Sequence, residues 1–178
     1  MQLAALIALL TLAAPAGPAP APAPAEKARV TILILSAKPG DNRDGEGVDP
    51  RLAAKLRVSL QQLGMEKPDL DSLVKPVTRV VGSGETAAAA SGGAGVEATC
   101  QSAGDDGVTL SVALFTEVKE GRKTVRRYSD PTVVKFSKPG KVQSFVQPEG
   151  KGVRICVVSA VREGDAQKGG GDAPKDRK

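Results

Sequence analysis

The chain has 178 residues, a formal net charge of +5 and only 2% aromatic residues. Its basic residues are interspersed with acids, and so few aromatic side chains leave little for stacking on bases, which argues against nucleic acid as a partner. The sequence contains no histidine, so it lacks the commonest general base at neutral pH and the commonest ligand of transition metals.

The N-terminus has the pattern of an export signal. Residues 3–14 form an apolar run that is too short to span a bilayer but has the length of a signal-peptide core. We expect cleavage after Ala16, because a cut after Ala14 would place Pro15 beside the scissile bond. An uncleaved anchor or a buried helix is the alternative, since no Lys or Arg precedes the run. We therefore predict a signal peptide over residues 1–16, a periplasmic or secreted mature protein, and no transmembrane span after cleavage.

Two further segments lack the composition of a folded domain. Residues 17–28 are rich in Pro and Ala, which is typical of an extended polyproline II linker. Residues 164–178 are rich in Gly and charge and have no large apolar side chains, which predicts a disordered tail. A single folded domain is therefore expected over residues 29–163.

The domain is expected to begin with one strand and one helix. Residues 30–35 (VTILIL) are apolar on both faces, which predicts a strand covered on both sides. A helix should follow, with Asp49 as its N-cap, Pro50 at its first position and Gly64 as the left-handed residue that ends it. Its apolar stripe would consist of Leu52, Leu56, Leu60 and Leu63.

The rest of the domain alternates between short apolar strands and turns rich in Gly and Pro. A loop with two prolines is expected at residues 66–76, and a break in a later strand at Asp130-Pro131, because proline cannot donate to a ladder. This pattern predicts a mainly-β fold, an antiparallel β-sandwich or partly open barrel with one early amphipathic helix. The expected strands cover residues 77–81, 84–91, 95–101, 108–118, 124–136, 142–147 and 153–161.

The loop before the helix concentrates carboxylates and glycines. Its acids are Asp41, Asp44, Glu46 and Asp49. A helix-loop-helix calcium site with Gly45 at its sixth position would place Gly40 and Arg51 where acids are required. We interpret the loop as the turn that begins the helix, with acids near the positive end of the helix dipole. A weak, irregular calcium site at the four acids and a carboxylate-based catalytic site are the alternatives.

A second concentration of charge lies in a predicted hairpin. Its basic residues are Lys119, Arg122, Lys123, Arg126 and Arg127. They are either a patch for an anion or a partner, or a solvated tip whose charge prevents pairing between sheet edges.

The chain has two cysteines, Cys100 and Cys156. An even number of cysteines in an exported chain predicts a disulfide, which requires their strands to be neighbours or to face each other across the core. The alternative is two buried thiols that act as small apolar residues. Two thiolates without histidine leave zinc short of ligands, so a zinc site is not expected.

Three segments carry a resemblance to a known family. They are GSGETA, GVEATCQSAGDDGVTLSVAL and GKGVRICVVSAV, and all three lie within residues 80–161. Their order of strands and Asp-Gly turn resembles the β-domain of bacterial outer-membrane secretins. The chain lacks the proline expected after residues 96–100 and the closing Gly-Gly-Leu of that family. The resemblance implies an envelope β-module, and it transfers no catalytic or binding residue.

Together these features predict an exported, non-catalytic binding or structural module of the bacterial cell envelope. We expect no cofactor, and a partner that is another envelope protein or a surface polymer. The alternative function is a carboxylate-based hydrolase or transferase with its site at the Asp41–Asp49 loop, where the same acids offer a weak calcium site.

Overall fold

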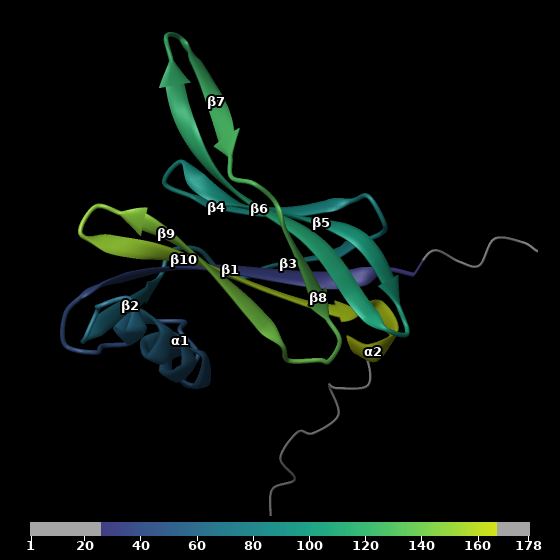
Figure 1. Cartoon of the computed structure of the whole chain (residues 1–178), viewed down its shortest axis with the longest axis horizontal. Helices are drawn as coiled ribbons and strands as arrows, with labels where there is room; N and C mark the ends of the chain where they lie inside the picture. Colours follow the sequence, from purple (N-terminus) through teal and green to yellow (C-terminus); the bar gives the residue numbers. More distant parts are fainter. Residues whose placement is uncertain (1–25, 167–178) are drawn as a thin grey trace, which may run out of the picture.

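The computed structural model describes residues 26–166, which form two antiparallel sheets packed face to face and a helix against the outer face of the first sheet (Figure 1). This architecture confirms the expected mainly-β sandwich with one early helix. The predicted signal peptide, residues 1–16, lies outside the described residues, as do most of the linker and of the tail.

The first sheet, sheet A, is organised around its longest strand, β1. Strand β10 pairs with one edge of β1, while β2 and β3 pair with opposite ends of its other edge. Strand β9 pairs with β10 and forms the end of the sheet. The bounds are β1 Ala28–Pro39, β2 Pro68–Ser72, β3 Val77–Val81, β9 Val142–Glu149 and β10 Gly152–Arg162.

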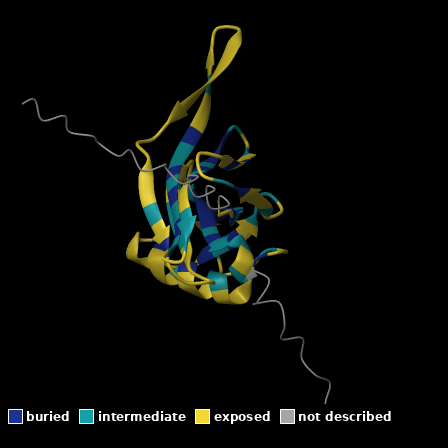
Figure 2. Ribbon diagram, turned by 90° about the vertical axis from the view of Figure 1, so that its right-hand side faces the viewer, coloured by how far each residue is buried: buried dark blue, intermediate teal, exposed yellow. Residues whose placement is uncertain are grey.

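The second sheet, sheet B, repeats this plan around β6. Strand β5 pairs with one edge of β6, whereas β7 and β8 share the other edge, separated near the Asp130-Pro131 break that the sequence predicts. The outer half of β6 and the whole of β7 project from the body as an exposed hairpin (Figures 1 and 2). The bounds are β4 Thr86–Ser91, β5 Ala94–Gly104, β6 Gly107–Glu120, β7 Lys123–Tyr128 and β8 Thr132–Phe136.

Strand β1 is covered on both faces, as its sequence predicts. Val30, Ile32 and Ile34 pack between the two sheets, whereas Leu35 and Ala37 pack beneath the helix, and all five are fully buried. Burying a side chain of the size of Val, Leu or Ile stabilises the fold by about 1.5–3 kcal/mol. The strand therefore holds the two apolar cores together.

Helix α1 spans Pro50–Gln62 and begins as expected. The carboxylate of Asp49 accepts hydrogen bonds from the backbone N–H groups of Arg51 at 2.8 Å and Leu52 at 3.0 Å. The expected stripe is wrong at Leu63, which is 66% exposed because it follows the last helical turn and precedes the reversal at Gly64. Helix α1 buries the smaller Ala53 instead, together with two of the expected leucines, Leu56 and Leu60.

Several strands extend beyond their expected ends, β1 most of all, and two segments form elements that the sequence did not predict. The segment expected to be a loop contains β2, because Leu70 is fully buried and the strand pairs with the end of β1. The expected tail begins inside a short helix, α2 (Glu163–Ala166). Helix α2 is held at its start by the N–H of Glu163, which donates to the carbonyl of Lys27 at 2.9 Å.

Replacing the buried Leu56 should destabilise the protein far more than removing the helix cap. We expect Leu56→Ala to lower the free energy of unfolding by about 2–5 kcal/mol and Asp49→Ala to lower it by about 1 kcal/mol. Leu63→Ala, at an exposed position of the same segment, is the matched control and should change it by less than about 0.5 kcal/mol. Urea unfolding measures all three. Equal small losses for Leu56→Ala and Leu63→Ala would mean that α1 is not packed on sheet A.

Candidate functional site

The acidic loop between β1 and α1 is organised by ion pairs and backbone contacts. Asp41 pairs with Arg43 at 3.0 Å, and Asp44 pairs with Arg57 of α1. Asp49 caps the helix. Within residues 26–166, no group of three or more Cys, Asp or Glu side chains is arranged to hold a metal ion. The structure thus does not bring the four candidate ligands, Asp41, Asp44, Glu46 and Asp49, together as a site, and the turn interpretation accounts for three of them.

A carboxylate that sequence reasoning missed holds this loop in place. One oxygen of Asp69, on β2, accepts the backbone N–H groups of Asp41 and Arg43, both at 2.8 Å. These two hydrogen bonds hold the pKa of Asp69 below its usual value. A Cβ at Gly40 would overlap the same carboxylate, so glycine is needed there for the close approach. The carboxylate of Asp69 is therefore structural.

The basic residues of the β6–β7 hairpin do not form one uniform patch. Arg126 pairs with Glu97 at 3.0 Å and with Glu117 at 3.2 Å, and Arg127 pairs with Glu120 at 2.9 Å. Among residues 26–166, the other three members of the predicted patch have no ion-pair partner, and they are exposed near the tip. They are Lys119, Arg122 and Lys123.

The root of this hairpin is fixed by a buried aromatic ring on the outer face of sheet B. The guanidinium of Arg126 lies 4.4 Å from the centroid of the Phe115 ring, and the ring of Tyr128 lies 5.8 Å from it. The hydroxyl of Tyr128 donates to Glu97 at 3.0 Å. A Cβ at Gly95 would meet the tip of the Phe115 ring at 2.7 Å. Arg126 therefore anchors the hairpin and is not available to a partner.

The predicted disulfide is not present. Cys100 on β5 and Cys156 on β10 both lie in the core between the sheets, fully buried, as free thiols. They belong to opposite sheets, on β5 and β10, and no bond joins their sulfur atoms. Burial raises the pKa of Cys156 from 9.0 to about 11, and it also raises the pKa of Cys100. Cys100 and Cys156 therefore match the alternative expectation, that of two buried thiols that act as small apolar residues.

One end of the core between the sheets is polar. Ser36 of β1, Arg154 of β10 and Gln147 of β9 lie opposite one another in the sheet register. Ser36 and Arg154 are each only 5% exposed. Further along β10, Cys156 and Val158 occupy the same inner face and belong to the apolar core. The core therefore ends at a buried guanidinium.

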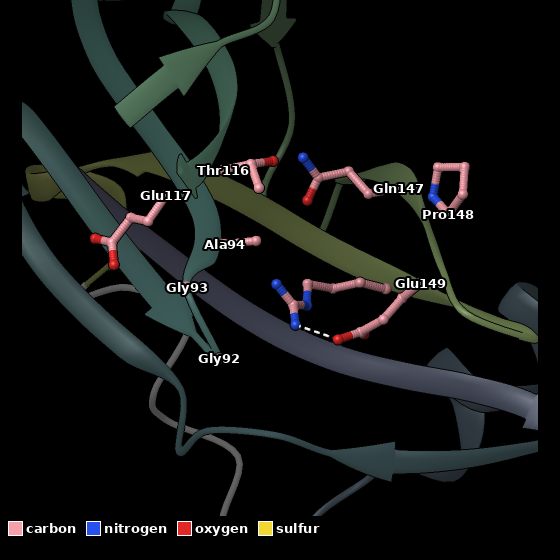
Figure 3. A pocket seen from close by; sticks show the side chains of 9 residues that line it. Gly92, Gly93, Ala94, Thr116, Glu117, Gln147, Pro148 and Glu149 are labelled. Carbon is pink, nitrogen blue, oxygen red and sulfur yellow. Dashed lines mark hydrogen bonds and ion pairs between the residues drawn. The ribbon is translucent and has the colours of Figure 1, made fainter. Parts of the chain in front are cut away.

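A cavity of about 340 Å³ opens beside this guanidinium (Figure 3). Its walls are the β4–β5 turn, the root of the β6–β7 hairpin, the end of β9 and Arg154 itself. Gly92 and Gly93 form the turn with positive φ angles, and a Cβ at Gly92 would lie 3.3 Å from Nη2 of Arg154. The backbone at this turn can therefore approach the arginine closely.

The hydrogen bonding of Arg154 is incomplete. Its Nη2 donates to Oε1 of Glu149, the ion pair drawn as a dashed line in Figure 3. Its Nε is buried and has no partner among the described residues, and the same holds for Oε1 of Gln147 on the cavity wall. A guanidinium carries five N–H donors, so this cavity presents donors to an incoming oxygen atom. Such an arrangement can bind a carboxylate.

Sequence reasoning missed this site, although a signal for it was present. In the strand VRICVVSAV, Arg154 falls on the same face as Cys156, Val158 and Ala160, which is the face expected to be buried. A charged residue at an inner-face position is rare unless it is paired or functional. The other walls come from distant turns, and no local pattern points to them.

Comparison with family models, with curated proteins and with solved structures gives no match. The likeness to the secretin β-domain therefore stays a prediction. Within residues 26–166, neither helix is long and apolar enough to cross a bilayer.

The buried thiols should make stability depend on alkaline pH. The pKa of Cys156 is about 11 in the folded protein, above the ordinary thiol value of 9.0. The contribution of the protonated thiol to the free energy of unfolding is therefore complete below pH 9 and is lost as the pH rises toward 11. Chemical unfolding between pH 8 and pH 11 should show a falling free energy of unfolding. In the Cys156→Ala variant this fall should be smaller.

Thiol titration is the control for that prediction. Denatured, unreduced protein should give two free thiols, while the native protein at pH 8 should react slowly, because the thiolate is the reactive form and both groups are buried. If the denatured protein gives no free thiol, the two cysteines form a disulfide after all, and the prediction of free thiols is wrong.

Proposed function

We propose that the protein is an exported, non-catalytic binding module of the bacterial cell envelope, and that the Arg154 cavity receives a carboxylate of its partner. The observation that carries this proposal is the buried guanidinium whose Nε has no partner among the described residues and which lines the cavity. The partner is an envelope protein or a surface polymer that bears acidic groups.

Energetics favour a ligand at this position. Leaving a buried donor unsatisfied costs about 1–3 kcal/mol, and more when the group is charged. A bound carboxylate would pair with the donors of Arg154 that border the cavity, which suits the planar fork of a guanidinium. Ser36, Gln147 and the glycine turn surround the arginine, so the ligand would meet a site that is already formed.

Glu149 occupies part of this site and can give way. Its side chain is 47% exposed, whereas that of Arg154 is 6% exposed. A half-exposed carboxylate regains hydration when it leaves, so a ligand carboxylate can replace it at lower cost than it could replace a buried one. Glu149 therefore acts as an internal competitor that keeps Arg154 paired when the ligand is absent.

The hairpin would provide a second contact. Thr116 and Glu117 at its root line the cavity, and Lys119, Arg122 and Lys123 lie exposed toward its tip. An acidic partner bound at Arg154 could extend along these three side chains. Such rim charges mainly raise the association rate and make it depend on salt.

The alternative of a carboxylate-based hydrolase or transferase has less support. Asp41, Asp44 and Asp49 are engaged with Arg43, Arg57 and the start of α1. The acids that line the cavity, Glu117 and Glu149, are also paired with arginines. The absence of histidine from the chain removes the usual base.

Carboxylate binding can be tested by calorimetric titration with succinate and with a short poly-glutamate peptide. We expect saturable binding, and Arg154→Met should weaken it at least about 30-fold, because truncating one partner of a buried charged hydrogen bond costs about 2–5 kcal/mol or more. Glu149→Gln should bind more tightly, since the competitor loses its charge. Arg79→Met, on the exposed part of β3, is the matched control and should bind as the wild type does. Equal affinities for the wild type and Arg154→Met would reject the site.

Export has its own test. N-terminal sequencing of the protein from culture medium or periplasm should begin at Gly17, because cleavage is expected after Ala16. Membrane-bound protein that retains Met1 would make the segment an anchor instead.

A further inference from the structure

The edges of the two sheets differ in how they are protected against pairing with another strand. Exposed edges are usually protected by charged side chains, by proline or by short length. Strand β2 has five residues with Pro68 and two aspartates, β3 carries Arg79, β7 is strongly basic, and β8 is five residues long with Lys135. The edge strand β4 is uncharged, but it contains only Thr, Ala and Ser.

Strand β9 has this protection only at its end, where Pro148 and Glu149 lie. Over its eight residues, VQSFVQPE, the only charge is Glu149 at its end, and it pairs with β10 alone among the described strands. Two of its valines, Val142 and Val146, are 38% and 39% exposed. Val142 also lines an apolar groove of about 460 Å³ between α1 and sheet A. The edge is therefore long, apolar and open.

Pro148 shows which backbone groups point outward. A proline has no N–H and is accommodated on an edge strand where the N–H would face away from the sheet. The β9–β10 hairpin has a two-residue loop, so Glu149 and Gly152 are the pair next to it, and their neighbour Pro148 faces outward. By alternation, the N–H and C=O groups of Val142, Ser144 and Val146 also face outward.

We propose that β9 pairs antiparallel with β9 of a second copy of this chain, about a two-fold axis at Ser144. In this register Ser144 lies opposite the partner's Ser144, and Val142 lies opposite the partner's Val146. All of these are outward-facing residues, so each pair can exchange two backbone hydrogen bonds. The two copies of sheet A then form one continuous sheet.

The pairing of side chains favours a second copy over an unrelated strand. The two valine pairs lie on the outer face of sheet A, where β-branched pairs stabilise a ladder. The antiparallel direction also places Lys141, just before β9, opposite the partner's Gln147. A two-fold axis repeats each of these contacts, as an isologous dimer requires.

Oligomeric state tests the proposal directly. Light scattering behind size-exclusion chromatography, on the mature chain at about 1 to 300 μM, should show a concentration-dependent dimer. Val142→Lys and Val146→Lys should each give a monomer, because charge on an edge strand prevents pairing. Val133→Lys is the matched control: this valine is 62% exposed on β8, an edge strand of sheet B, so its variant should still dimerise. A wild type that stays monomeric throughout this range would overturn the proposal.

The register has a separate test. Ser144→Cys should form an intermolecular disulfide on mild oxidation, because directly opposite hydrogen-bonded residues have Cα atoms about 5.5 Å apart. Ser137→Cys, in the exposed loop before β9, should not cross-link, and the native Cys100 and Cys156 are buried. A dimer that survives Val146→Lys and does not cross-link through Ser144→Cys would use another surface, and the proposal would be wrong. The Arg154 cavity is tested independently, because neither valine lines it.

Discussion

The structure depends on a single strand that is enclosed on all sides. Strand β1 has β10 on one edge, β2 and β3 on the other, sheet B over one face and α1 over the opposite face. Its inward residues Val30, Ile32 and Ile34 are apolar. Its other face begins with Arg29 and Thr31, so a slip by one residue would turn these polar side chains into the core. Strands β2, β3 and β10 pair with it directly, and both cores include its side chains.

The polar end of the sandwich is a consequence of the same packing. Arg154 lies on the inner face of β10, in line with Cys156 and Val158, but one step beyond the apolar core. A buried charge in that position needs a partner, either a residue of opposite charge or a ligand. Glu149 provides a partner from the neighbouring strand, and the β4–β5 turn leaves room for another. An apolar side chain in place of Arg154 would extend the core to this end of the sandwich and would offer no donor to a ligand.

The acidic loop and the basic hairpin are both more structural than their composition indicates. Asp69 fixes the loop through two backbone N–H groups, and Asp49 begins the helix. On the hairpin, Arg126 lies over the ring of Phe115 and pairs with two glutamates. In each case a group that looks like a ligand in the sequence is held by a residue distant along the chain, and only the remaining charges stay available to a partner.

Local patterns in the sequence were enough to determine most of the elements. The alternation of the strands, the cap at Asp49 and the break at Asp130-Pro131 act within a few residues, so the sandwich, the start of α1 and the separation of β7 from β8 could all be predicted. Strand β2 was missed because its short, proline-containing sequence becomes a strand only through pairing with β1. The placement of the two cysteines in opposite sheets and the Arg154 cavity depend on how the sheets face each other and on which turns meet at one end. Those are long-range contacts, and only the tertiary structure decides them.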